Sequence, residues 1–336
     1  MNNDNIKTSR EEFCNDVDLL KKYNEVVLTK YNKLEDCIIA CVVSHDYLFE
    51  LFVFYASIRK SWSLFPWKII AFSTDIATVD KVNLLDLPGL EARQLIAPST
   101  DSSWGSTAAL KVSLIEHSGL DRAIVSDLDN LFLRETPELF LLASDYDVAF
   151  IGAPHSEWII QTSLWSFRRT DASVRFANLW AQESLDRLYS DASGLPFALS
   201  KNVDENLSVC VLAKSKIDGA AHHLCPYDIQ VNIRPLHLKS DALGVFEKHM
   251  GRAKVVHFAG LRAVGSESVV ARMQTLAADF PESSIIFPYY LECANEAARI
   301  LGLAVVEDEP GLLDSLSKKK AKSKKKRWFM KVFCRS

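Results

Sequence analysis

The sequence predicts an α/β fold in which helices cover both faces of a mainly parallel sheet. Short apolar runs rich in β-branched residues recur along the chain, and most are followed by a longer segment with apolar residues at helical spacing. This alternation is typical of βαβ units, which build parallel sheets that are buried on both faces. With 336 residues, the chain is long enough for one large domain with an extension, or for two small domains.

The expected strands are short and apolar, and the expected helices are longer. Strands are predicted at 37–44, 67–74, 90–97, 122–129, 146–153, 159–169 and 253–260. Helices are predicted at 46–62, 79–87, 106–120, 171–189 and 204–216. Gly119 lies near the end of one helix, where a C-cap is expected. Thr136 and Pro137 are typical of an N-cap and a first turn, so another helix should begin there.

Composition divides the chain into three parts. Residues 1–35 form a polar leader, and residues 36–305 form the folded domain, with a surface loop expected over 183–203. Residues 306–336 are predicted to be a linker, as far as residue 317, and a basic-aromatic tail. Ten of the 39 Lys and Arg residues lie in that tail, which has no acidic residue, although the whole chain has a net charge of −4. The rest of the chain is therefore acidic.

The basic tail at 318–336 has three possible interpretations. Lysines next to Trp328, Phe329 and Phe333 suit an anionic membrane surface, with the aromatic rings at the level of the headgroups. A nucleic-acid-binding arm and a merely solubilising tail are the alternatives. Because an acidic domain repels nucleic acid, we expect the membrane and no nucleic acid as partner.

Several features predict a cytoplasmic protein, peripheral on the inner face of a membrane. The N-terminus has no apolar segment typical of a signal peptide, and no uncharged run reaches the roughly 18 residues that a membrane span requires. The seven cysteines are odd in number and include no CxxC pair. Cys37 and Cys41 lie in an apolar run and are interpreted as buried free thiols, which favours a reducing compartment.

Two aspartates follow the apolar strand in the segment RAIVSDLD. Residues i and i+2 of a strand point to the same side, so Asp127 and Asp129 could converge on one cation, and carboxylate oxygens suit Mg²⁺ or Mn²⁺. A phosphatase of the haloacid-dehalogenase type uses a similar pair as nucleophile and general acid. Leu131 replaces the Thr or Val of that motif, the pair follows a late strand, and no GDxxxD motif follows, so a phosphatase is a distant alternative.

Over residues 37–262 the sequence resembles the GT-A glycosyltransferases, most closely the family-8-like retaining enzymes. The resemblance rests on the DxD motif with its Pro-Glu-Leu helix in DLDNLFLRETPELF, and on the HFxG motif in VVHFAG. It implies a Rossmann-like sheet with a nucleotide-sugar half at about 36–135 and a smaller acceptor half at about 136–305. It also implies that Asp127, Asp129 and His257 bind Mn²⁺ or Mg²⁺.

The resemblance extends to the donor and acceptor sites. It implies that the nucleotide-sugar donor, most simply a UDP-sugar, contacts Ser44, Asp46, Tyr47, Lys111, Asp127, Gly260 and Arg262. It implies that Asp204 positions the sugar or acceptor, and that Glu205, a carboxylate in place of the usual amide, acts as base, nucleophile or charge stabiliser. The chain also departs from the family, with Gln161-Thr162-Ser163 in place of Asn-Ala-Gly and Leu261-Arg262-Ala263 in place of Lys-Pro-Trp.

The function expected from this resemblance is transfer of a sugar from a nucleotide-diphosphate sugar to a hydroxyl acceptor, with retention of configuration. The acceptor would be a glycan or a glycolipid, for example lipopolysaccharide. The departures from the family motifs leave one alternative from another class, a non-catalytic protein that binds sugar nucleotides or carbohydrates on the same fold.

Overall fold

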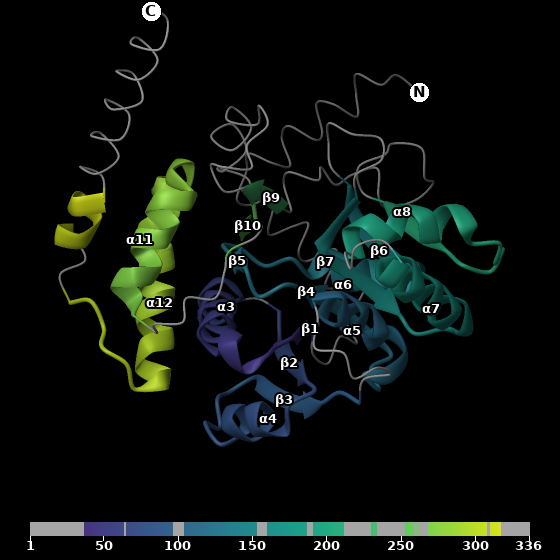
Figure 1. Ribbon diagram of the computed structural model, residues 1–336, viewed down its shortest axis with the longest axis horizontal. Coiled ribbons are helices and arrows are strands. Elements are labelled where there is room, and N and C mark those ends of the chain that lie inside the picture. Colours follow the sequence, from purple (N-terminus) through teal and green to yellow (C-terminus); the bar gives the residue numbers. More distant parts are fainter. Residues whose placement is uncertain are drawn as a thin grey trace, which may run out of the picture.

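The computed structural model is built on a seven-stranded sheet with helices on both faces (Figure 1). The strands, in the order β3-β2-β1-β4-β7-β6-β8, span Leu90–Gln94, Trp67–Ser73, Cys37–Val42, Arg122–Ser126, Ile160–Arg168, Val148–Gly152 and Val209–Val211. The structure describes residues 37–63, 65–96, 104–152, 160–186, 191–211, 230–233, 253–258, 261, 268–307 and 310–316.

Most strand pairs in this sheet are parallel. β1 pairs in parallel with β2 and β4, and β2 with β3. β7 is the exception, because it is antiparallel to both β4 and β6. The predicted α/β fold with a mainly parallel sheet is therefore confirmed. The chain order reverses between β1 and β4, and open sheets of this kind bind ligands at such a switch point, outside the carboxyl ends of the strands.

The sheet separates two hydrophobic cores, because alternate residues of each strand point to opposite faces. Ile39, Ile69 and Ile124 belong to one core, and Ala40, Ile70 and Val125 to the other. Figure 1 shows α3 and α12 on one side of the strands and α5, α7 and α8 on the other. These helices span Leu48–Ser61, Phe287–Leu301, Trp104–His117, Asp171–Asp186 and Asp191–Lys201, and the remaining ones, α4, α6 and α11, span Ile76–Asn83, Pro137–Asp145 and Val269–Asp279.

A second, three-stranded sheet lies beside the carboxyl end of β4. Its strands, in the order β5-β10-β9, span Asn130–Phe132, Val255–Phe258 and Gln230–Ile233. β5 follows directly after β4 and pairs antiparallel with β10, with Asn130 opposite His257. In this way the small sheet brings a segment more than a hundred residues distant in sequence to the residues that follow β4.

The C-terminal helices are part of the same folded body. Helix α3 is buried around most of its circumference and packs against α12, where the Tyr289 hydroxyl contacts the carbonyl oxygens of Ser57 and Phe132 at 3.2 and 2.8 Å. Gly302 follows α12 with φ of 68°, a left-handed C-cap that glycine adopts without strain. None of the described helices is long and apolar enough to cross a lipid bilayer.

Two local predictions are wrong. The part of the helix expected over 204–216 that the structure describes, residues 204–211, is not helical and ends in β8, which pairs with β6. The loop expected over 183–203 contains α8, in which Gly194 lies close to the Ser184 backbone and Leu195 is buried, so packing outweighs the helix-breaking effect of Gly194 and Pro196. The linker expected over 306–317 stays a prediction; within it, residues 310–316 are helical and Leu316 is buried.

The polar leader and the basic tail lie outside the described residues, and the division of 36–305 into two halves stays a prediction. The predicted burial of Cys37 and Cys41 is confirmed, since both are nearly inaccessible to solvent. Gly119, expected to cap the helix before β4, has φ of 70° two residues after α5 ends.

A buried carboxylate, Asp147, joins β8 and the loop before α7 to the sheet. Its oxygens accept hydrogen bonds from the Ser208 N–H at 2.9 Å, from Arg168 Nη2 at 3.0 Å and from the Thr170 hydroxyl at 3.0 Å. Burial raises the pKa of Asp147, but these bonds outweigh that effect and hold the pKa below its ordinary value of 3.8.

Replacing Asp147 with Asn is therefore expected to destabilise the fold in a pH-dependent way. At pH 7 the loss should be roughly 2 kcal/mol, the range for hydrogen bonds to a charged group. Because the folded-state pKa is depressed, this stabilisation is complete above pH 3.8 and disappears as the pH falls through the folded value. Urea unfolding of the wild type and Asp147→Asn should show that the difference in their free energies of unfolding becomes smaller between pH 7 and pH 3. A difference that stays constant over this range would contradict this account.

Candidate functional site

The candidate site lies at the carboxyl ends of β1 and β4. Ala40 of β1 is level with Val125 of β4 in the parallel pair, so the two strands end at the same edge of the sheet. Ser44 follows β1 as an exposed residue, and Asp127 follows β4. The charge of Asp127 adds to the effect of burial in raising the pKa of Cys41, as expected for residues on neighbouring strands.

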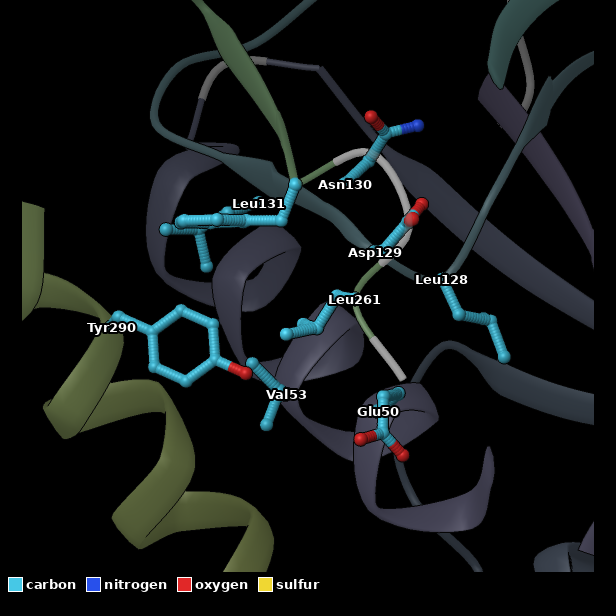
Figure 2. Close-up of a pocket in the computed structure, with 9 residues that line it drawn as sticks. Glu50, Val53, Leu128, Asp129, Asn130, Leu131, Leu261 and Tyr290 are labelled. Atoms are coloured by element: carbon cyan, nitrogen blue, oxygen red, sulfur yellow. The ribbon is translucent and has the colours of Figure 1, made fainter. Parts of the chain in front are cut away.

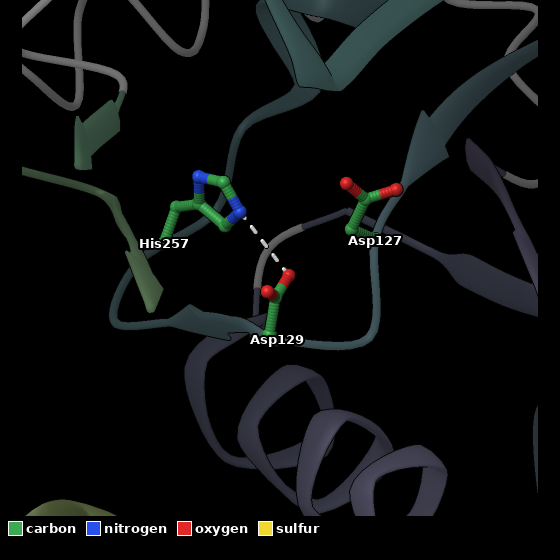
Figure 3. Close-up of side chains that lie close together, drawn as sticks. All are labelled: Asp127, Asp129 and His257. Atoms are coloured by element: carbon green, nitrogen blue, oxygen red, sulfur yellow. Dashed lines mark ion pairs between the residues drawn. The ribbon is translucent and has the colours of Figure 1, made fainter. Parts of the chain in front are cut away.

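Three potential metal ligands converge at this edge. One donor atom from each of Asp127, Asp129 and His257 lies within 4.8 Å of the other two. Figure 3 shows Asp127 at the end of β4, Asp129 in the turn that follows, and His257 reaching across from β10. His257 Nε2 lies 3.2 Å from Asp129 Oδ1. The structure thus brings together the three residues that the sequence predicted as metal ligands.

The reason given for the pairing of the two aspartates needs correction. Strand β4 ends at Ser126, and residues 128–129 form a turn, so Asp127 and Asp129 are not successive residues on one face of a strand. The turn is closed by the Asn130 N–H, which donates to the Asp127 carbonyl at 3.3 Å. The two carboxylates converge because the chain reverses between them.

Lys111 of α5 carries the positive charge of the site. Its ammonium group donates to Asp127 Oδ1 at 2.7 Å and to the Thr162 carbonyl at 2.9 Å, and the residue is buried. A buried lysine is stabilised by such a charged partner. The Asp127 side chain, by contrast, is 33% exposed. The lysine therefore orients this carboxylate, which still has access to solvent and to a ligand.

The donor set fits a divalent cation. Asp129 Oδ1 is buried and has no hydrogen-bond partner among the residues that the structure describes, apart from the ion-pair contact to His257. A buried acceptor without a hydrogen bond is costly, and a cation would satisfy it. Two carboxylates and one imidazole form a mixed oxygen and nitrogen set, which divalent first-row metals accept.

The charges of the two aspartates also act on the histidine. Burial lowers the pKa of His257, but the negative charges of Asp129 and Asp127 outweigh that effect, and the pKa lies above its usual value of 6.5. Lys111 opposes the aspartates. The two aspartates are therefore compensated by His257 and Lys111, and together these four residues form one cluster of charges.

A small cavity of about 10 Å³ lies under the turn, which is room for about one water molecule (Figure 2). Its walls include Asp129, Leu128, Glu50 of α3 and Tyr290 of α12. Burial raises the pKa of Tyr290 to about 12. The cavity is too small for a nucleotide sugar, so the donor would have to bind on the open side of the aspartates.

Sequence reasoning missed Asn130, which directly follows the second aspartate. The residue is 2% exposed, and its side-chain amide donates to the Ser126 hydroxyl at 2.9 Å and to the Ser163 carbonyl at 2.7 Å. The available signal was an amide side chain within the apolar segment DLDNLFL. A polar residue in such a place must find partners on folding.

The remaining predicted residues are placed as follows. Ser44 and Asp46 are exposed and Tyr47 is half-buried, and all three lie at the same sheet edge as Asp127. Gly260 and Arg262 lie outside the described residues. Among the departures from the family motifs, Gln161, Thr162 and Ser163 lie on β7, with the Thr162 carbonyl bound to Lys111.

The structure does not bring Asp204 and Glu205 to the three metal-ligand candidates. Asp204 accepts hydrogen bonds from Arg175 of α7, whose charge and hydrogen bonds lower its pKa, and Glu205 is exposed. This segment precedes β8 and lies near Asp147, level with the start of β4, where Arg122 pairs with Arg168. β4 is five residues long, so roughly 15 Å of strand separates the two edges. A catalytic role for Asp204 and Glu205 stays a prediction without support from this geometry.

Solved glycosyltransferases have similar folds. The bifunctional glycosyltransferase WbbM aligns with a TM-score of 0.50 and 10% sequence identity, over 83% of this chain and 51% of its own. The glycosyltransferase GlyE of Streptococcus pneumoniae TIGR4 aligns with 0.46 and 10%, over 85% and 64%. The galactosyltransferase LgtC, in complex with donor and acceptor sugar analogues, aligns with 0.46 and 11%, over 82% and 99%.

The chain thus spans about half of the WbbM chain and less than two thirds of the GlyE chain. Neither a scan against models of protein families nor a search of curated proteins found a match. At 10% identity, the likeness to WbbM shows a shared fold. The molecule is an α/β protein of the GT-A type, with a cluster of two carboxylates and one imidazole at the switch point of its sheet.

Proposed function

We propose that this protein is a metal-dependent glycosyltransferase that takes its sugar from a nucleotide-diphosphate sugar. The observation that carries the proposal is the convergence of Asp127, Asp129 and His257 at the carboxyl end of β4, on a fold shared with solved glycosyltransferases. Ligands of open α/β sheets bind at this edge, and oxygen-rich cation sites commonly bind diphosphates there.

Asp127, Asp129 and His257 would hold the cation, and Mn²⁺ suits this mixed set better than Mg²⁺, which prefers oxygen ligands. When bound, the cation neutralises charge on the diphosphate as it leaves. Lys111 orients Asp127, to which its ammonium group donates at 2.7 Å. Its buried positive charge would also favour negative charge on the diphosphate of the donor. Ser44, Asp46 and Tyr47, at the end of β1, would contact the nucleotide.

The finer assignments rest on the sequence resemblance. They are a UDP-sugar as donor, retention of configuration, and a hydroxyl acceptor on a glycan or glycolipid such as lipopolysaccharide. Gly260 and Arg262 would complete the phosphate side of the site. Asp204 and Glu205 are the acceptor-side candidates of the same resemblance, although their separation from the metal ligands argues against direct contact with the reacting atoms.

The test is an assay of the full chain with a panel of nucleotide sugars and Mn²⁺, which measures release of the nucleoside diphosphate. We expect one of the nucleotide sugars to be cleaved slowly by water. Cleavage should become faster once an acceptor is added, and it should stop when a chelator removes the metal. Release of inorganic phosphate from monoesters instead would indicate the phosphatase.

A non-catalytic protein that binds sugar nucleotides is the second candidate. The observation that favours it is the position of the two acceptor-side candidates. Glu205 is exposed, Asp204 forms an ion pair with Arg175, and neither carboxylate lies near the metal-ligand candidates. Such a protein would gain thermal stability from one nucleotide sugar in the presence of Mn²⁺ and would release no nucleoside diphosphate from it. The two measurements together separate a binder from a transferase.

We further propose that the basic-aromatic tail holds the protein on the inner face of an anionic membrane. Each Lys or Arg near such a surface contributes about 1 kcal/mol, and the tail has ten. In co-sedimentation with vesicles that contain phosphatidylglycerol, the full chain should pellet at low salt, and a chain without residues 318–336 should stay in the supernatant. Equal pelleting of both would refute the role of the tail, and binding to RNA but not vesicles would favour the nucleic-acid alternative.

A further inference from the structure

Asn130 is a buried polar residue next to the three metal-ligand candidates. It directly follows Asp129 and is the first residue of β5. At 2% exposure, its side-chain amide must find partners inside the protein, since an unsatisfied buried amide is costly. The direction of its hydrogen bonds therefore shows what the residue holds in place.

The side chain joins the two strands on either side of the turn. Its amide group donates to the Ser126 hydroxyl, at the end of β4, and to the Ser163 carbonyl of β7. The same Ser163 carbonyl accepts the Asp127 N–H at 2.8 Å. One carbonyl oxygen of β7 therefore holds the turn at both ends, through the first aspartate and through the residue after the second.

The main chain of Asn130 connects the same turn to the third ligand. Its N–H donates to the Asp127 carbonyl, and the residue stands opposite His257 in the antiparallel pair of β5 and β10. On the other side of that pair, the Phe258 N–H donates to the Asp129 carbonyl at 2.9 Å. The position of Asn130 thus determines where Asp127, Asp129 and His257 lie relative to one another.

We propose that Asn130 is a positioning residue that sets the affinity of this site for a divalent cation. Its hydrogen bonds to Ser126, Ser163 and the Asp127 carbonyl act on the backbone of the turn, and its pairing with His257 acts on the register of β5 against β10. Groups that orient metal ligands in this way typically contribute tenfold to a hundredfold in metal affinity. The inference rests on the proposed metal dependence and adds a residue to it.

The test is direct Mn²⁺ binding to the full chain, followed by electron paramagnetic resonance of free Mn²⁺, with no donor or acceptor present. Asn130→Ala is expected to weaken binding at least about tenfold. Ser126→Ala removes one acceptor of the Asn130 amide, together with the hydrogen bond of the Ser126 hydroxyl to the Asp127 carbonyl at 3.1 Å, and should weaken binding about twofold to fivefold. The double variant should bind Mn²⁺ more tightly than the two separate losses would predict if they were added, because the two residues share one contact.

Asn295→Ala is the matched control. Asn295 is also 2% exposed, and its amide bonds the main chain of Val306 in both directions, at 3.2 and 2.9 Å. It lies on α12 and lines no part of the metal site. Its loss should lower the melting temperature about as much as Asn130→Ala does and leave Mn²⁺ affinity unchanged.

The outcomes are distinguishable. If the wild type binds Mn²⁺ and Asn130→Ala and Ser126→Ala bind it equally well, Asn130 is not a positioning residue and the proposed function stands. If the wild type binds no Mn²⁺, the metal-dependent function and the inference both fail. If Asn130→Ala does not fold, Ser126→Ala decides, because a loss of affinity without a change in melting temperature supports the inference and unchanged affinity overturns it.

Discussion

Replacing Asp129 with alanine is expected to lower the rate of donor cleavage with Mn²⁺ by a factor of at least about a hundred. The variant removes one of three cation ligands, and the electrostatic contribution of a metal ion to such reactions is several kcal/mol, where each 1.4 kcal/mol corresponds to a factor of ten in rate. It also removes the charge that pairs with His257. We therefore expect weaker Mn²⁺ binding together with the loss of rate.

The measurement is kcat for nucleoside diphosphate release over a range of Mn²⁺ concentrations, for the wild type and Asp129→Ala. Asp186→Ala is the control, because Asp186 ends α7 and is hydrogen-bonded on the helix surface to Gln182. The control should keep both the rate and the Mn²⁺ dependence. Full activity of Asp129→Ala at the same Mn²⁺ concentration would exclude the aspartate pair as a metal site and leave the proposed mechanism without its main support.

The parts of the fold that could be predicted depend on local pattern. Ile38 to Val42 and Ile69 to Phe72 are continuous apolar runs, and strands covered on both faces are the elements that give such runs. The position of the aspartates at a strand end, and therefore at the ligand-binding edge, follows from the same pattern. The structure adds what pattern cannot give, namely that β7 runs antiparallel and that β10 pairs with β5.

Predictions failed where tertiary contacts decide. The segment that contains Asp204 and Glu205 has a charged start typical of a helix, yet Val209 to Val211 extends the sheet because it pairs with β6 and Asp147 anchors Ser208. No local signal reports either partner. Asn130 is the converse case. An amide in an apolar segment indicates that the side chain needs hydrogen-bond partners, but the sequence does not show that these partners lie on either side of the turn between Asp127 and Asn130.

The second large effect is expected on stability, at the buried ion pair of Glu50 and Arg272. Glu50 of α3 is 2% exposed and Arg272 of α11 is 1% exposed, so both charges are removed from water. One carboxylate oxygen of Glu50, Oε2, has no hydrogen-bond partner among the described residues, so Arg272 is the main compensation for its charge. Replacing Arg272 with Met is therefore expected to cost about 3–5 kcal/mol, the range for a buried charge that loses its partner.

Replacing both residues, with Glu50→Leu and Arg272→Met, should restore most of that loss, because well-packed apolar side chains of similar volume are often as stable as a buried pair. Arg299→Met is the matched control, since Arg299 is 60% exposed and pairs with Glu296 three residues away, a surface contact worth less than about 1 kcal/mol. Urea unfolding of the four proteins measures these differences. A loss below 1 kcal/mol in Arg272→Met would mean that water reaches Glu50, through the cavity that it shares with Asp129. The pair would then be a solvated contact beneath the turn that carries Asp129.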